Sequence, residues 1–132
     1  MKIIIAGGRN ISDYSLVQKA IDLSGFRVTE VVSGCAPGVD TLGRFWAGAT
    51  GIPVKRFPAN WNDLTHTDAR IKSNKLGQKY DANAGHRRNT EMAEYADGLI
   101  LIWDGRSPGS ADMKRKAKKV NIPIYEYLVG GR

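Results

Sequence analysis

The stretch Lys2-Ile3-Ile4-Ile5-Ala6-Gly7-Gly8-Arg9 decides the fold, because it joins a short apolar run directly to a pair of glycines. A continuous apolar run of this length is typical of a buried strand, and glycine permits the tight turn that follows. Between Asp13 and Leu23 the apolar residues then fall at helical spacing. The stretch therefore predicts a strand, a glycine turn and a helix in direct succession.

The same unit recurs along the chain. Alternation of strands and helices predicts right-handed crossovers and a parallel sheet that is covered on both faces. We expect an α/β fold, a Rossmann-like three-layer αβα sandwich with a mainly parallel five-stranded sheet. It would form one domain over 1–128, followed by a flexible tail over 129–132. After the first unit, we expect strands over 28–33, 52–57, 98–103 and 122–127, and helices over 37–49, 85–96 and 110–120, the last with Ser110 as its N-cap.

Residues 58–84 break this periodicity. The segment is rich in Asn, Asp, Lys and Thr. A stretch of this length inside a compact domain is usually mobile or functional, or else it hides a helix. If the ligand is a nucleotide, we expect this segment to decide base specificity, with the ring of Trp61 lying against a base.

Length and composition exclude several classes of protein. The chain has 132 residues, 42% of them hydrophobic and 25% charged, which fits one globular domain and disfavours disordered, collagen-like and coiled-coil chains. Its apolar runs are far shorter than the ~20 residues that span a bilayer, and no signal-peptide pattern is present. We therefore expect a cytoplasmic protein with no membrane partner. The single Cys35, with only His66 and His86, predicts no disulfide, metal site or cofactor.

The formal charge of +7 predicts attraction to anions. Nucleotides, nucleic acid and an acidic partner protein all fit that charge. The densest basic run lies over 114–119, in the later part of an expected helix, where cations complement the helix dipole. A solvated helix face explains this run, and a nucleic-acid surface is the alternative.

Three expected strand-to-helix turns can bring backbone amides close to an anion. They lie over 7–9, 33–40 and 104–110, at the carboxyl ends of strands, where ligands bind in open α/β sheets. Each turn also has a purely structural explanation, since tight turns need glycine with or without a ligand. None of the three fits the G-x-G-x-x-G fingerprint or the Gly-Lys-Ser/Thr phosphate loop, which disfavours dehydrogenases and P-loop ATPases.

Charged side chains in and near these turns have two interpretations each. Arg9 offers a forked contact to phosphate or carboxylate, or else a surface salt bridge. Asp40 favours the dipole of its helix, or accepts hydrogen bonds from ribose hydroxyls. The segment 84–92 places two arginines and a histidine at a helix start, where they oppose the dipole. Either a bound anion or acidic residues must compensate them, with Glu91 and Glu94 as candidates.

In this order the motifs resemble the SLOG superfamily, specifically its small YspA-like (YpsA-related) branch, which is common in bacteria and phages. The resemblance implies a Rossmann-like fold that binds a nucleotide or nucleotide-derived ligand in the crevice between the loops. It also implies self-association into a homo-oligomer, and a location in the cytoplasm of a bacterium or of a phage's host. The motifs are Ile5-Ala6-Gly7-Gly8-Arg9, Ser33 to Asp40, Ala59-Asn60-Trp61, Ala84 to Asn89 with Met92, and Trp103-Asp104-Gly105 continuing to Gly109-Ser110.

More distant SLOG relatives include the LONELY GUY phosphoribohydrolases, which cleave the base from a nucleoside 5′-monophosphate, and the DNA-processing protein A family, which binds single-stranded DNA. The hydrolases use an arginine, to which Arg88 corresponds, and a glutamate, where this chain has Met113. Methionine cannot stabilise the oxocarbenium character of N-glycosidic cleavage. Asp112 would point about 100° away around an ideal helix. Asp104 and Asp40 are the candidates to supply a carboxylate from another loop in place of this glutamate.

Three functional hypotheses follow. The first is a domain that binds, senses, sequesters or processes a nucleotide-derived ligand. The second is a phosphoribohydrolase or N-glycosidase on a nucleoside 5′-monophosphate or an ADP-ribose-type substrate, with Arg88 orienting it and Asp104 or Asp112 as the acid. The third is a nucleic-acid module that uses the basic helix. The expected ligand-binding residues are Gly7, Gly8, Arg9, Ser33, Gly34, Gly38, Asp40, Trp61, Arg88, Asn89, Gly105, Ser107, Gly109 and Ser110.

Overall fold

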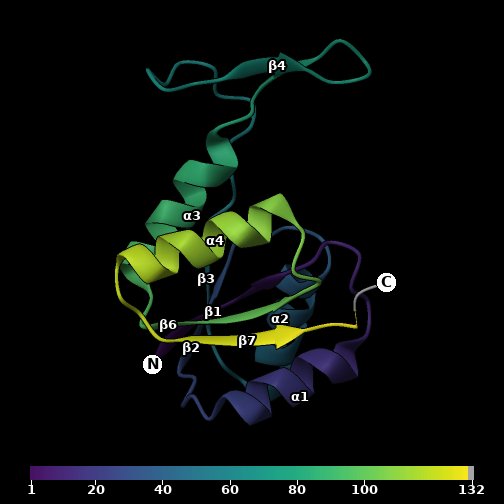
Figure 1. Cartoon of the computed structure of the whole chain (residues 1–132), viewed down its shortest axis with the longest axis vertical. Coiled ribbons are helices and arrows are strands. Elements are labelled where there is room, and N and C mark those ends of the chain that lie inside the picture. The colour runs from purple at the N-terminus through teal and green to yellow at the C-terminus, as the bar shows by residue number, and fades with distance from the viewer. Residues whose placement is uncertain (131–132) are drawn as a thin grey trace.

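A five-stranded parallel sheet in the order β3-β2-β1-β6-β7 forms the centre of the computed structural model, which describes residues 1–130 (Figure 1). The Rossmann-like αβα sandwich that the sequence predicts is confirmed. Its strands are β1 (Lys2–Gly7), β2 (Glu30–Ser33), β3 (Val54–Arg56), β6 (Gly98–Trp103) and β7 (Ile124–Leu128); its helices are α1 (Tyr14–Ser24), α2 (Val39–Thr50), α3 (Ala84–Tyr95) and α4 (Pro108–Lys119).

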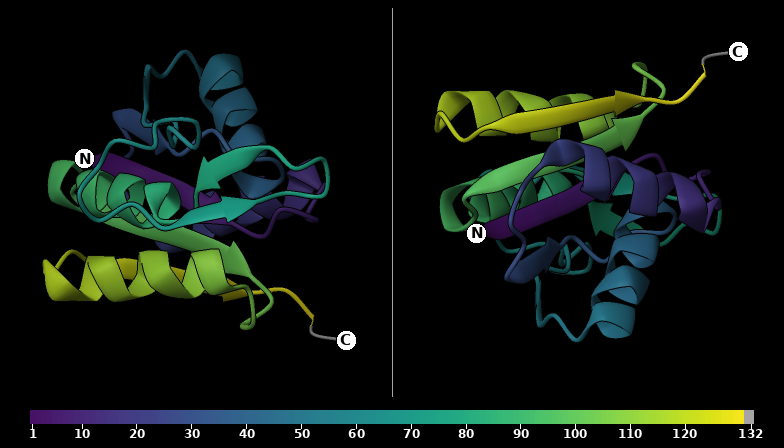
Figure 2. Two further views of the ribbon diagram at one scale, coloured as in Figure 1. Left: turned by 90° about the horizontal axis from the view of Figure 1, so that it is seen from above. Right: turned by 90° about the horizontal axis from the view of Figure 1, so that it is seen from below.

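Two helices cover each face of this sheet (Figures 1 and 2). Successive residues of a strand point to opposite faces, so β1 divides its side chains between the two cores. Ile3 and Ile5 pack with α1 and α2, whereas Ile4 packs with α3 and α4. Every residue of β6 is buried. The two central strands are therefore covered on both sides, as a parallel sheet requires.

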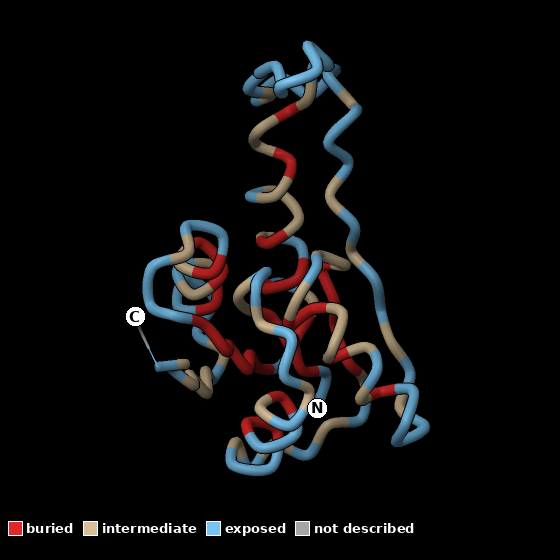
Figure 3. Tube along the Cα trace, turned by 90° about the vertical axis from the view of Figure 1, so that its right-hand side faces the viewer, coloured by how far each residue is buried: buried red, intermediate tan, exposed pale blue. Residues whose placement is uncertain are grey.

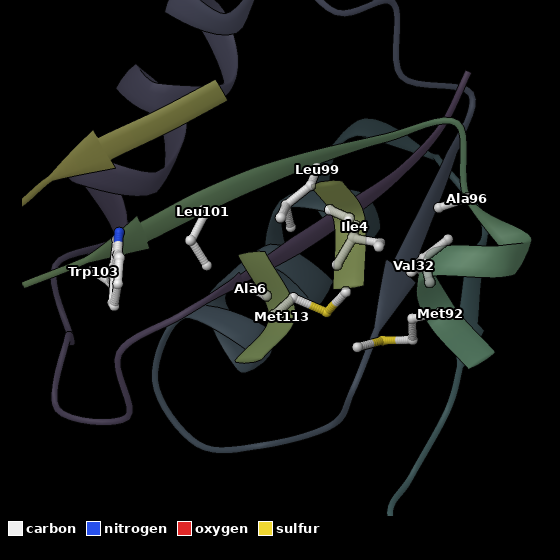
Figure 4. Packing of buried hydrophobic residues seen from close by; sticks show 11 residues of the cluster. Ile4, Ala6, Val32, Met92, Ala96, Leu99, Leu101, Trp103 and Met113 are labelled. Carbon is white, nitrogen blue, oxygen red and sulfur yellow. The ribbon is translucent and has the colours of Figure 1, made fainter. Parts of the chain in front are cut away.

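The core under α3 and α4 contains a methionine from each helix (Figure 4). Met92 of α3 and Met113 of α4 are both almost fully buried and belong to the same cluster as Ile4 and Leu99. A flexible thioether side chain fills irregular gaps between helices and a sheet. Met113 thus has a clear packing role at the position where the hydrolases carry a glutamate.

Helix α4 begins earlier than the sequence predicts. Its first residue is Pro108 and its N-cap is Ser107, so Ser110 lies inside the first turn rather than at the cap. Proline is favoured at the first helical position because its missing N–H has no partner there in any case. The carboxylate of Asp104 accepts hydrogen bonds from the N–H groups of Arg106 (2.8 Å) and Ser107 (3.1 Å), which shapes the turn before the helix.

The aperiodic segment 58–84 contains a β-hairpin and not a hidden helix. Strands β4 (Ile71–Ser73) and β5 (Lys79–Asp81) pair antiparallel and lie apart from the main sheet, beyond the N-terminal end of α3 (Figure 1). Most of the hairpin is exposed (Figure 3). Asp81 is the exception, because its fully buried carboxylate forms an ion pair with Arg87 of α3.

The chain end continues along the sheet for one residue past β7. The N–H of Val129, a residue of the predicted tail, donates a hydrogen bond to the carbonyl oxygen of Trp103 (2.8 Å). Residues 131 and 132 of that tail lie outside the described residues. Each of the helices in the described part of the chain is too short and too polar to cross a lipid bilayer.

Two glycines of α2 provide a test of the packing. A Cβ at Gly43 would lie 2.8 Å from the Cγ2 of buried Ile5, whereas a Cβ at Gly48 would meet open space. We expect Gly43→Ala to lower the free energy of unfolding by about 1–2 kcal/mol, because overpacking outweighs the gain in helix propensity. Gly48→Ala should raise it by about 0.5–1 kcal/mol. Urea unfolding of both variants checks this, and equal effects of the two substitutions would contradict the packing.

Candidate functional site

The candidate site lies at the carboxyl ends of β1 and β6. The chain continues from β1 to one side of the sheet and from β6 to the other, so these neighbours form the topological switch point where α/β sheets bind ligands. A crevice of about 290 Å³ opens there. It is bordered by all three predicted loops and by α3. Its lining includes eight of the predicted residues, namely Gly7, Arg9, Asp40, Arg88, Asn89, Ser107, Gly109 and Ser110.

Two glycines allow the loops to meet so closely. A Cβ at Gly7 would lie 1.8 Å from the carbonyl oxygen of Ile102, so no other residue fits at the end of β1. Gly38 has φ +78°, and a Cβ there would lie 2.2 Å from the carbonyl oxygen of Gly8. That oxygen accepts a hydrogen bond from the N–H of Val39 (3.2 Å). The first and second loops are thus in direct backbone contact.

Acidic residues contact two of the three basic side chains at the start of α3. Arg87 forms ion pairs with Asp68 and Asp81. Burial raises the pKa of Asp81, but the hydrogen bonds from Arg87 and two backbone N–H groups outweigh it and lower that pKa to about 2. The Nδ1 of His86 lies 3.0 Å from the carboxylate of Asp112. All three acids are distant in sequence from α3 or lie on another element.

Arg88 has no acid within ion-pair distance in the described residues, although the charge of Asp40 acts on it from nearby. Its guanidinium donates hydrogen bonds to the carbonyl oxygen of Gly34 and to the Oδ1 of Asn89 (3.0 Å). In the described part of the chain it forms no ion pair, and neither Glu91 nor Glu94, the acids that the sequence suggested, pairs with any cation. Burial lowers the pKa of Arg88, so its charge is incompletely solvated.

A second arginine reaches the same crevice from the first loop. Arg9 is exposed, and among residues 1–130 its side chain has neither a hydrogen bond nor an ion pair. Its two predicted alternatives were an anion contact and a surface salt bridge, and the structure shows no salt bridge. Arg9 also borders two neighbouring hollows, so it stands where three concave surfaces meet.

The start of α4 supplies backbone donors. No side chain caps this helix, and Pro108 at its first position has no N–H. The N–H groups of Gly109 and Ser110 have no acceptor within residues 1–130, and both residues line the crevice. Free N–H groups at a helix N-terminus favour an anion. Over the same described range, no group of three or more His, Cys, Asp or Glu side chains is arranged to hold a metal ion.

Asp40 is the buried acid of the crevice. It is 5% exposed, and its Oδ2 accepts a hydrogen bond from the N–H of Ala36 (3.3 Å). Burial raises the pKa of Asp40 to about 6, although the backbone N–H of Ala36 and the charge of Arg88 act in the opposite direction. This carboxyl group therefore titrates close to neutral pH.

Asp112 lies outside the crevice, which removes it as an acid acting there. Its side chain points to α3, where it accepts hydrogen bonds from the Nδ2 of Asn89 (2.9 Å) and from His86. It also accepts one from Lys116 of its own helix (3.2 Å). Burial raises the pKa of Asp112, but these hydrogen bonds outweigh it and lower the pKa. Met113, by contrast, lines the crevice. The helix rotation expected from the sequence is therefore confirmed, even though the helix begins earlier.

Several predicted residues support the crevice without lining it. Ser33 is buried, and its Oγ accepts a hydrogen bond from the N–H of Cys35 (3.1 Å). Gly34 leaves room for Arg88, since a Cβ there would lie 2.6 Å from its Nη1. Gly38 permits the close backbone contact between the second loop and the first. Gly105 lies in an exposed turn with φ +84°.

The other two predicted ligand-binding residues, Gly8 and Trp61, border adjoining hollows, as does the predicted acid Asp104. Gly8 and Asp104 line a hollow of about 530 Å³ that Arg9 also borders. The backbone hydrogen bonds from Arg106 and Ser107 lower the pKa of Asp104. Trp61 lies against Gly85 at the base of the hairpin. The lining of the crevice also includes Ala36, Met92 and Pro108, which lie inside the quoted motifs but have no ionisable group to mark them.

The basic run of α4 is largely paired. Lys114 contacts Glu126 (2.9 Å), and Arg115 and Lys116 contact Asp112 (3.4 and 3.2 Å). These contacts fit the interpretation as an ordinary helix face. They leave few free cations in the run for a nucleic-acid backbone.

The pH dependence of stability tests the environment of Asp40. Its folded-state pKa lies above the ordinary value of 3.8, so the folded protein binds more protons than the unfolded chain between about pH 4 and pH 6. The ionisation of Asp40 therefore lowers the free energy of unfolding as the pH rises through this range. Asp40→Asn removes this cost. Relative to wild type, the variant should gain up to about 3 kcal/mol between pH 4 and pH 7, at about 1.4 kcal/mol per pKa unit. Urea unfolding at several pH values measures it, and a pH-independent difference would refute it.

Comparison with known structures supports the fold. The X-ray structure of DNA processing protein A from Streptococcus pneumoniae superposes with a TM-score of 0.72 and 21% sequence identity, over 98% of this chain and 50% of that chain. This chain therefore spans about half the length of the matched one. At this identity the likeness concerns the fold. No curated protein matches the sequence.

The sequence itself carries a family signature. Residues 1–63 match the model of the YspA, cpYpsA-related SLOG family, a range that includes the first two loops of the crevice and the motif ending in Trp61. This match agrees with the SLOG resemblance that the motifs predict, and it extends over slightly less than half of the chain.

Proposed function

We propose that the protein binds a nucleotide or nucleotide-derived ligand, with a phosphate group of that ligand in the crevice. The observation that carries this proposal is the convergence of Arg9, Arg88 and the free N–H groups of α4 on one small cavity. Neither arginine has a carboxylate within ion-pair distance in the described part of the chain. An anion is the partner that all these donors share.

Phosphate fits the donors better than a carboxylate does. A guanidinium matches the oxygens of phosphate with two parallel hydrogen bonds, and a helix N-terminus adds N–H groups that point at the same anion. The chain is also related to SLOG proteins over residues 1–63, and the resemblance of its motifs implies a nucleotide ligand. The solved structure of similar fold is of a protein named for DNA processing, which agrees with a ligand built from nucleotides.

The role of Asp40 follows from its position beside this anion. A phosphate close to a buried carboxyl group disfavours the ionised form of that group. The ligand would therefore bind together with a proton on Asp40, whose pKa of about 6 lies near neutral pH. Affinity would rise as the pH falls from 7.5 to 6.

Substitution of Arg9 gives the cleanest test. Its side chain makes no hydrogen bond and no ion pair within the described residues, so Arg9→Ala should change the melting temperature of the free protein little. It should weaken binding of nucleoside 5′-monophosphates by roughly tenfold or more, because a charge-assisted hydrogen bond contributes about 1.5–3 kcal/mol. Isothermal titration calorimetry with the four monophosphates measures this.

Two further variants complete the test. Arg88→Lys keeps the charge and loses the fork, so it should also weaken binding. Arg27→Ala is the control, because Arg27 is an exposed arginine in the loop before β2, at the opposite end of the strands. Unchanged affinity in Arg9→Ala, or an equal loss in Arg27→Ala, would show that the anion binds elsewhere.

A second candidate function is cleavage of the base from a nucleoside 5′-monophosphate or an ADP-ribose-type substrate. The observation in its favour is the carboxyl group of Asp40, which lies in the crevice with a pKa of about 6, in the range of a general acid or base. A mechanism of the LONELY GUY type is disfavoured, because the crevice has Met113 where those hydrolases have a glutamate. Release of free base by the wild type, and its loss in Asp40→Asn with binding retained, would establish the activity. Binding without base release leaves the binding function.

A further inference from the structure

The hairpin borders a second concave surface, which is separate from the crevice. A hollow of about 640 Å³ lies between the base of the hairpin and Arg9. We propose that this hollow binds a second nucleotide unit of the same ligand, which makes the ligand at least a dinucleotide. This inference rests on the proposed function, since it extends the ligand whose phosphate lies in the crevice.

The lining of the hollow combines the groups that contact a nucleotide. It contains two aromatic side chains, three amides and two cations, and two of the amides, those of Asn74 and Gln78, hydrogen-bond to each other (2.9 Å). Trp61 and Tyr80 lie with ring centroids 6.4 Å apart, nearly edge to face, and Trp61 is 36% exposed. Aromatic rings stack on bases, and amides hydrogen-bond to base edges. The lining residues are Arg9, Trp61, Asn62, Asn74, Gln78, Lys79 and Tyr80.

Hydrogen bonds hold the two rings in this arrangement. The N–H of Asp81 donates to the carbonyl oxygen of Trp61 (2.7 Å), and the carboxylate of Asp81 accepts a hydrogen bond from the N–H of Arg70 (2.9 Å). The ion pair between Asp81 and Arg87 fixes the whole base of the hairpin to α3. An isolated two-stranded hairpin is marginally stable in water, so this attachment gives the hollow its shape.

Charge on the hairpin favours a ligand with more than one phosphate. Residues 70–80 contain four cations and no acidic residue, which is more than half of the net charge of +7. The register of the hairpin places Lys72 opposite Tyr80, on the same face of the two strands. Lys79 lines the hollow itself. A base alone needs no such cations, whereas a further phosphate does.

Arg9 connects the two surfaces. It borders both the crevice and the hollow, so the phosphate that it contacts would lie between them. The crevice, at about 290 Å³, is at the lower end of the volumes of ligand sites and leaves little room beyond one phosphorylated unit. A ligand that also occupies the hollow must continue past that phosphate.

The test compares ligands of one and two units. The probes are the four nucleoside 5′-monophosphates, the four corresponding 5′-phosphorylated dinucleotides, and NAD, in which a pyrophosphate joins two nucleosides. We expect a dinucleotide or NAD to bind the wild type roughly tenfold or more tightly than the matching monophosphate, because one base stacks on aromatic rings. The dinucleotide and NAD arms distinguish a phosphodiester from a pyrophosphate linkage, and a gain in either supports the proposal.

Two hairpin lysines form a matched pair of variants. Both are exposed, but only Lys79 lines the hollow, and Lys75 lies at the hairpin tip. Lys79→Ala should abolish most of the gain and lower the salt dependence, by about 0.7 in the log–log slope for one phosphate contact. Lys75→Ala should change neither. Trp61→Phe should keep part of the gain that Trp61→Ala loses, since phenylalanine keeps a ring.

Three results would overturn the inference in different ways. If monophosphates bind in an Arg9-dependent manner and the longer probes bind no more tightly, the second unit is wrong and the proposed function stands. If none of the probes binds, both are wrong. Equal losses in Lys79→Ala and Lys75→Ala would show a general effect of charge and no occupied hollow.

Discussion

The close approach of the backbone around Gly7 is the constraint on which the site depends. A Cβ at this residue would overlap the carbonyl oxygen of Ile102, and one at Gly38 would overlap the carbonyl oxygen of Gly8. The glycines therefore let β1 end directly beside β6 and let the second loop rest on the first. Because β1 ends beside β6 and the first two loops meet without intervening side chains, the crevice there is bordered by backbone as well as by two arginines. The same packing fills the space under the loops with Met113, which leaves the crevice without the glutamate of the LONELY GUY hydrolases.

Electrostatics in the fold separates structural cations from those available to a ligand. Arg87 is neutralised by Asp68 and Asp81, and the basic run of α4 is held by Asp112 and Glu126. These pairs join α3 to the hairpin and α4 to β7. Arg9 and Arg88 have no such partners in residues 1–130, so the switch point of the sheet carries two unpaired cations. Formal charge alone cannot reveal this, because it counts paired and unpaired cations equally.

Hydrophobic periodicity explains how much of this could be predicted. The runs over 3–6 and 98–103 are buried strands, and their alternation with helices indicates a parallel sheet covered on both faces. The hairpin was missed because its strands have three residues each and almost no buried side chain, so no apolar pattern marks them. The start of α4 was placed too late because Ser110 is a good N-cap residue, whereas Ser107 followed by Pro108 makes the actual start. The predicted loops do border the crevice, but the acids that pair with the basic residues of α3 lie outside this helix, where spacing along one helix cannot identify them.

A crystal structure of the protein with a bound nucleoside 5′-monophosphate tests the central claim most directly. The account predicts the phosphate in the crevice, within hydrogen-bonding distance of the N–H groups of Gly109 and Ser110 and of the guanidinium groups of Arg9 and Arg88. A phosphate bound instead along the exposed lysines of α4, with the crevice filled only by water, would contradict it.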